Sequence, residues 1–163
     1  MTYLLDTNAY LEAKQRYYRF NICPGFWHWL TSESHPEELL SVKPVLEELK
    51  YYEDDLSGWA KNNARFFASV DDENTQAYFA GIAEFVAGHE IFQERHKASF
   101  LDAADPWLIA KAMTLGATLV THEKLEASNS TKVKIPNICQ EFSVPYCDTF
   151  DLLERSDVVF VLG

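Results

Sequence analysis

The stretch that decides the fold is Thr2-Tyr3-Leu4-Leu5-Asp6-Thr7-Asn8, at the start of the chain. Its first four residues form an apolar run with β-prone side chains, which predicts a short buried strand over residues 2–5. Asp, Thr and Asn then predict a turn, and Thr7 or Asn8 is suited to cap a helix running through residues 9–14. An acidic side chain therefore stands directly after the first buried strand.

Strand and helix signals alternate along the rest of the chain. Short apolar runs predict strands at 39–42, 117–121, 145–149 and 158–162. Helical spacing of apolar residues predicts helices at 44–52, 55–67, 72–89 and 105–115, whereas the polar stretch 89–99 is expected to connect. We expect Asp105 to be the N-cap of the last helix and Gly116 to end it. This alternation predicts an α/β fold with three layers, α/β/α, around a central parallel sheet.

Length and composition narrow the class of protein. The 163 residues show no repeat and no linker, so residues 1–163 are expected to form a single domain. We expect a cytoplasmic protein without a membrane segment, because the sequence has no basic, apolar leader and no apolar window that could cross a bilayer. The three cysteines, Cys23, Cys139 and Cys147, are unsuited to a disulfide framework. A net charge of −11 argues against a broad nucleic-acid footprint, because Lys and Arg carry phosphate binding.

Four acidic residues are attached to apolar segments: Asp6, Glu48, Asp105 and Glu123. Asp6 and Glu123 follow predicted strands, whereas Glu48 lies on a predicted helix and Asp105 at the start of another. Parallel sheets gather such positions at the carboxyl ends of their strands. Four converging carboxylates repel one another unless a divalent cation neutralises them. The pattern therefore predicts a Mg²⁺ or Mn²⁺ site, which is typical of phosphodiester chemistry.

Each of these positions also has an ordinary structural interpretation. Asp6 and Asp105 could cap helices, Glu123 could be a polar turn residue, and most helix glutamates are solvated. Among neighbouring residues, Thr7 and Asn8 are candidates to orient Asp6, and Thr121 could offer its hydroxyl to a ligand or a water. Three further assignments stay open: Glu47 is the alternative to Glu48, Asp102 could join Asp105, and His122 could be a general acid or a loop residue.

These motifs together resemble those of the PIN-domain family of metal-dependent nucleases. The resemblance rests on Asp6-Thr7-Asn8 after a strand, on Glu48-Leu49, on Asp105-x-x-Leu108-Ile109-Ala110, and on Thr121 followed by Glu123. Their order and approximate spacing agree over nearly the whole chain. Arg16-Tyr17-Tyr18-Arg19-Phe20 and Ala104-Asp105-Pro106-Trp107 are similar to a bacterial VapC-like subgroup of toxins. The chain departs from the family in having Glu123 where Asp is usual, and in its greater length.

The resemblance implies an endoribonuclease that uses Mg²⁺ or Mn²⁺ and leaves a 5′-phosphate. It makes Asp6, Glu48, Asp105 and Glu123 the catalytic metal ligands, and it implies an RNA substrate, a cognate antitoxin and a homodimer. Three alternatives remain: a housekeeping RNA-processing nuclease, a non-catalytic PIN-like interaction module, and a phosphatase of the haloacid-dehalogenase kind. The phosphatase needs a second acid where Asn8 stands.

The densest basic and aromatic segment lies early in the chain. Lys14, Arg16 and Arg19 could contact phosphate. The aromatic run from Tyr17 to Trp29 could stack on bases, but we expect it to form core and interface.

Overall fold

The computed structural model describes residues 1–163 and has a five-stranded parallel sheet at its centre. The strand order is β3-β2-β1-β4-β5, and every neighbouring pair is parallel. Leu4 lies opposite Leu40 of β2 and Leu119 of β4, so the first strand is the middle of the sheet. The strands are β1 (Thr2–Leu5), β2 (Glu38–Val42), β3 (Phe67–Ala68), β4 (Thr118–Val120) and β5 (Tyr146–Cys147).

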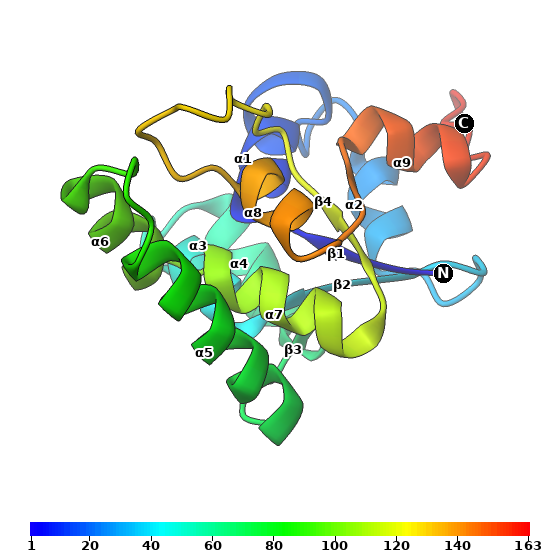
Figure 1. Ribbon diagram of the computed structural model, residues 1–163. Helices are drawn as coiled ribbons and strands as arrows, with labels where there is room; N and C mark the ends of the chain where they lie inside the picture. The colour runs from blue at the N-terminus through cyan, green and yellow to red at the C-terminus, as the bar shows by residue number, and fades with distance from the viewer.

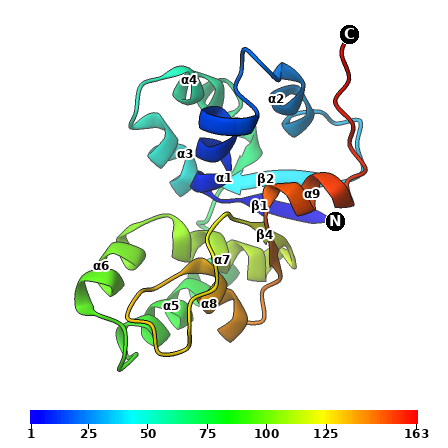
Figure 2. The same ribbon diagram turned by 90° about the horizontal axis from the view of Figure 1, so that it is seen from above.

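Helices cover both faces of this sheet. On one side lie α1 (Thr7–Glu12), the π-helical turn η1 (Ala13–Tyr17), α2 (Pro24–Leu30), α3 (Lys43–Lys50) and α4 (Asp55–Asn62). The other side carries α5 (Glu73–Ala87), α6 (Glu94–Asp102), α7 (Asp105–Leu115) and α8 (Ile135–Glu141). The remaining elements are the 3-10 turn η2 (Ala64–Phe66) and α9 (Thr149–Arg155). Figures 1 and 2 show these layers, which confirm the predicted three-layer α/β/α architecture.

The strand order places a crevice between β1 and β4. The chain winds outward from β1 through β2 to β3, and then returns to the other side of β1 as β4 and β5. Parallel sheets bind ligands at such a reversal, beyond the carboxyl ends of the two strands. The backbone N–H of Asp6 donates to the carbonyl of Val120 at 2.9 Å, which holds the two strand ends together.

One core of 37 buried apolar residues unites the layers. Helix α7 crosses the middle of the sheet and contacts β1, β2 and β4, with Leu108 and Ile109 fully buried. On the opposite side Phe26 and Trp27 of α2 are buried, and Tyr18 stacks on Phe26. The aromatic run therefore serves mainly as core. All three cysteines are free, and no helix has the length and apolar character needed to cross a membrane.

Several predicted elements were wrong in type or extent. Residues 158–162 pair with no strand; they run extended, with Phe160 near Phe26 and Trp29. The predicted helix over 55–67 ends at Asn62, and Phe67 begins the short strand β3 instead. The stretch 89–99 contains much of α6, whose polar surface hides its helical period in the sequence. Asp105 is not an N-cap, because Ala104 occupies that position.

Candidate metal centre

Asp6 lies at the crevice between β1 and β4 and is almost fully buried. It occupies the N-cap position of α1, but its side chain makes no capping hydrogen bond. The Thr121 hydroxyl donates instead to Asp6 Oδ2 at 2.9 Å, and the same hydroxyl accepts the Glu123 N–H at 3.1 Å. The Asp6 carboxylate is buried, does not cap the helix and is oriented by Thr121 after the neighbouring strand β4. It is therefore well placed to bind a ligand.

Asp105 is the first residue of α7 and is partly buried. It makes no capping hydrogen bond and no ion pair, so the simple capping interpretation does not account for it. Pro106 follows within the first turn, where its missing N–H costs no helical hydrogen bond. Helix α7 thus starts with an unpaired carboxylate that faces the charge of Asp6.

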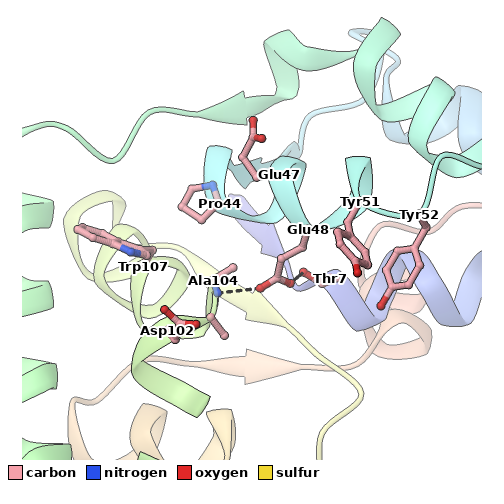
Figure 3. A pocket seen from close by; sticks show the side chains of 10 residues that line it. Thr7, Pro44, Glu47, Glu48, Tyr51, Tyr52, Asp102, Ala104 and Trp107 are labelled. Carbon is pink, nitrogen blue, oxygen red and sulfur yellow. Dashed lines mark hydrogen bonds between the residues drawn. The ribbon is translucent and has the colours of Figure 1, made fainter. Parts of the chain in front are cut away.

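Glu48 joins three parts of the chain through its two carboxylate oxygens. Oε1 accepts the Ala104 N–H at 2.8 Å, and Oε2 accepts the Thr7 hydroxyl at 2.6 Å. These bonds tie α3 to the start of α1 and to the turn before α7 (Figure 3). Glu47 points elsewhere: it is exposed and pairs with Lys50. Of the two glutamates, the structure brings Glu48 toward the other acids.

Glu123 is held from the far side of the crevice. Its Oε2 accepts the N–H of Ile135, the first residue of α8, at 2.7 Å. A carboxylate at a helix N-terminus is favourable because the unpaired N–H groups there carry partial positive charge. Its Oε1 accepts no hydrogen bond from the protein. The extra methylene of Glu relative to Asp therefore reaches α8 and leaves one oxygen free.

The charges of these four residues act on one another. Burial, followed by the charges of Glu123 and Glu48, raises the pKa of Asp6 from 3.8 to about 7 despite the hydrogen bond from Thr121. Burial and the charges of Asp6, Glu123 and Glu48 raise the pKa of Asp105 to about 8, and Lys134 opposes this rise. The four carboxylates are thus near enough for their charges to act on Asp6 and Asp105, whose pKa values are the most strongly raised of the set.

The donor set suits Mg²⁺ or Mn²⁺ in kind and in charge. All four side chains offer oxygen ligands, and none of them forms an ion pair with Lys or Arg. Each hydrogen-bonded oxygen retains a lone pair for a cation. The arrangement is looser than a finished ligand set, since no three His, Cys, Asp or Glu side chains are grouped so that they could hold one ion. Hydrogen bonds from Thr7 and Ala104 position Glu48, and the hydrogen bond from Ile135 positions Glu123.

Two predicted supporting residues, Asn8 and Asp102, lie differently from expectation, and the structure gives His122, whose role was open, a structural partner. Asn8 is exposed and makes no side-chain hydrogen bond, so Thr121 orients Asp6 where Asn8 was expected to. Asp102 ends α6 with an exposed side chain, and its charge is not among those that raise the pKa of Asp6 or Asp105. His122 bonds to the Thr149 hydroxyl at 2.8 Å, which ties it to the start of α9.

The groups that position Glu48 and Glu123 could not be predicted from the sequence. The Ala104 and Ile135 N–H groups are backbone donors, so their side chains carry no trace of the role. In the basic stretch, Lys14 pairs with Asp54 and Asp55, and Arg16 pairs with Glu12, so a phosphate contact by these residues stays a prediction. The cation that acts on Asp105 is Lys134, from the loop before α8.

The fold and the acidic crevice define a doubly wound α/β domain with a candidate metal centre at its reversal point. Residues 3–160 match the family described as a domain of unknown function, DUF4411, and the chain belongs to that family. No curated protein matches the sequence.

Solved structures that share the fold include two toxin–antitoxin complexes. One is VapBC2 from Rickettsia felis bound to a DNA fragment from its promoter, with a TM-score of 0.53 and 14% identity over 91% of this chain and 98% of the matched one. The other is VapBC-1 from nontypeable Haemophilus influenzae, with a TM-score of 0.53 and 17% identity over 91% and 98% of the two chains. The fold expected from the resemblance to VapC-like PIN domains is thereby confirmed.

Proposed function

We propose that this protein is a metal-dependent endoribonuclease that hydrolyses RNA phosphodiester bonds. The observation that carries the proposal is the placement of Asp6, Glu48, Asp105 and Glu123 around the reversal point of the sheet, where the charges of the set raise the pKa values of Asp6 and Asp105. Four oxygen-ligand side chains with no counter-ion are suited to Mg²⁺ or Mn²⁺. Such an ion lowers the pKa of a bound water and neutralises charge on a phosphate.

The residues of the chain divide this work between them. We assign Asp6 and Asp105 as the principal ligands, because neither side chain caps a helix and because their pKa values are the most strongly raised of the four. Thr121 fixes the direction of Asp6, and Glu48 is fixed by Thr7 and Ala104. Glu123 presents its free oxygen from the α8 side, where it can bind an ion or accept a proton from water. Lys134 supplies positive charge beside the carboxylates for a phosphate.

The biological role that we propose is the toxin of a toxin–antitoxin pair, with an antitoxin as partner and a homodimer as its assembled form. The support is the fold shared with two VapBC structures, together with the motifs of the VapC-like subgroup. Co-expression with the product of any small adjacent gene tests this role. Relief of growth arrest and co-purification are the expected results.

Cleavage of host total RNA tests the enzymatic proposal. We expect cutting in Mn²⁺ or Mg²⁺, none in EDTA, and none by the Asp6→Asn variant. Glu84→Gln is the matched control, since Glu84 is exposed within α5 and lines neither cavity beside the crevice. Cutting that persists in Asp6→Asn would contradict the proposal, because the carboxylate at its centre would be dispensable.

A further inference from the structure

A cavity of about 620 Å³ opens beside the acidic crevice, between the end of α3 and the turn before α7. Tyr51 and Tyr52 form one wall and Trp107 stands across from them (Figure 3). Thr7 and Glu48 also line the cavity, so an occupant would lie against one of the four carboxylates. The cavity therefore borders the candidate metal centre at Glu48.

The aromatic walls are unusually exposed for such large side chains. Tyr51 is 82% exposed and Tyr52 is 60% exposed, and their rings meet edge-on with centroids 5.4 Å apart. Trp107 is held in place by Phe79, which stacks on it with centroids 3.8 Å apart. The cavity thus offers two solvated phenol rings and one fixed indole, a combination that suits a flat aromatic guest.

A second cavity, of about 300 Å³, touches the same centre at Asp105. His96, Ser99, Lys132 and Lys134 line it, and neither lysine forms an ion pair. In a chain with a net charge of −11, these two lysines place positive charge directly beside an acidic residue of the centre. Such a position suits a negatively charged group, for example a phosphate.

We propose, resting on the ribonuclease function above, that the cavity of Tyr51, Tyr52 and Trp107 is a base-binding subsite for the RNA substrate. One unstacked base enters the cavity of Tyr51, Tyr52 and Trp107, the adjoining phosphate lies at the carboxylates, and a neighbouring phosphate lies against Lys132 and Lys134. A base within a duplex is stacked on both faces, so only a single strand or a loop can present one to this cavity. A basic protein segment would suit the aromatic and acidic cavity but not the two lysines.

Binding in an inactive background tests the proposal without relying on cleavage. Labelled single-stranded oligoribonucleotides are titrated with the Asp6→Asn protein in Mg²⁺, alone and with Tyr51→Leu/Tyr52→Leu added. We expect the double tyrosine change to weaken binding about tenfold, the loss typical of one stacked base. Tyr51→Phe/Tyr52→Phe is the matched control, because it keeps both rings and should bind within about twofold of the Asp6→Asn parent, since stacking needs only the π-face.

An abasic scan separates base recognition from general weakening. One abasic position near the cut should weaken RNA binding about tenfold in the protein that keeps both tyrosines. In the leucine variant the same abasic position should weaken binding no further, because the stacking contact is already absent. Lys132→Gln/Lys134→Gln should reduce the salt dependence of binding without altering the abasic profile.

Three results would overturn the proposal: equal binding by the leucine variant, equal binding of duplex and single strand, or no saturable binding of any single strand. A leucine variant that binds RNA normally but no longer captures a partner protein would instead make the cavity a protein-docking site. Base-dependent binding without nuclease activity in the unmodified protein would count against the proposed function alone. Metal-dependent cleavage with unchanged binding would count against the cavity alone.

Discussion

Glu48 illustrates how one side chain can position several others. Its two oxygens accept from Thr7 at the start of α1 and from the Ala104 N–H just before Asp105. The carboxylate therefore fixes the segments that carry Asp6 and Asp105, in addition to any role as a ligand. Substituting a group that orients metal ligands in this way typically lowers metal affinity or activity by about 10- to 100-fold.

Glu48→Gln should consequently lower the cleavage rate by about 10- to 100-fold, because an amide cannot accept both hydrogen bonds and carries no charge. The comparison is made with Glu47→Gln, whose exposed side chain bonds only to Lys50. Single-turnover rates at saturating Mg²⁺ are the measurement. If the two variants lost activity equally, the assignment of Glu48 to the centre would be wrong.

The four acids show how far a sequence predicts a site at the residue scale. Asp6 and Glu123 could be placed because each follows an apolar run that had to be a buried strand. Their hydrogen-bond partners could not, because Ala104 and Ile135 contribute backbone N–H groups that any residue carries. Asn8 was predicted to orient Asp6 from its position in the motif, yet the supporting hydroxyl came from Thr121, 115 residues away.

At the scale of elements, helix α7 is the piece that brings Asp105 over the sheet. It was predictable throughout its length because a Pro in its first turn and a Gly at its end bracket an apolar run. Gly116 adopts φ of 63°, the left-handed conformation that closes the helix. The two-residue strand β3 was not predictable, because Phe67 continues the apolar spacing of α4 and only its pairing with β2 makes it a strand.

Two glycine substitutions should have opposite effects on stability. Gly116→Ala should destabilise the protein by about 1 kcal/mol, because alanine is strained at positive φ. Gly81→Ala should stabilise it by about 0.5–1 kcal/mol, because Gly81 lies within α5 and an added Cβ meets no atom within 4 Å. Chemical denaturation measures both. A loss of stability in Gly81→Ala would contradict the helical role assigned to that position.

At the scale of the whole molecule, concentrated negative charge links stability to pH. The pKa values of Asp6 and Asp105 are raised from 3.8 in the folded protein, to about 7 and about 8. Between the ordinary pKa and these raised values, Asp6 and Asp105 keep their protons in the folded protein but have released them in the unfolded chain. Stability without metal must therefore fall as pH rises from about 4 to about 8. The pKa values of Asp54 and Asp72 are lowered, so these two residues change the stability of the protein only in more acidic solution.

Thermal unfolding in EDTA between about pH 5 and pH 8 tests this linkage. The midpoint should fall with rising pH in the wild type, and Asp6→Asn should flatten the fall. At about pH 8 the variant should melt a few degrees higher than the wild type, because an ionised, crowded carboxylate has been removed. At about pH 5 the gap should be smaller, because Asp6 is protonated in the folded protein and has only begun to lose stability through its ionisation in the unfolded chain. A variant that melts lower at the alkaline end would refute the charge crowding.

The architecture as a whole followed from the alternation of strands and helices, which left the three-layer parallel fold as the natural solution. The extent of the sheet could not be predicted in the same way. Residues 158–162 have the composition of a strand, but they do not pair with β5 or with any other strand. The aromatic cavity was also hidden. Tyr51 and Trp107 are far apart in the chain, and only the packing of α3 against the turn before α7 brings them to one cavity.

The central claim is that the crevice between β1 and β4 binds a divalent ion through Asp6 and its neighbours. Calorimetric titration with Mn²⁺ near pH 7 tests it most directly, in buffers of different ionisation enthalpy. We predict saturable binding with release of protons, because ligands whose pKa values are raised must ionise to bind the ion. Asp6→Asn should abolish this binding and Glu47→Gln should leave it intact. Absence of saturable binding in the wild type, or equal binding by Asp6→Asn, would contradict the account.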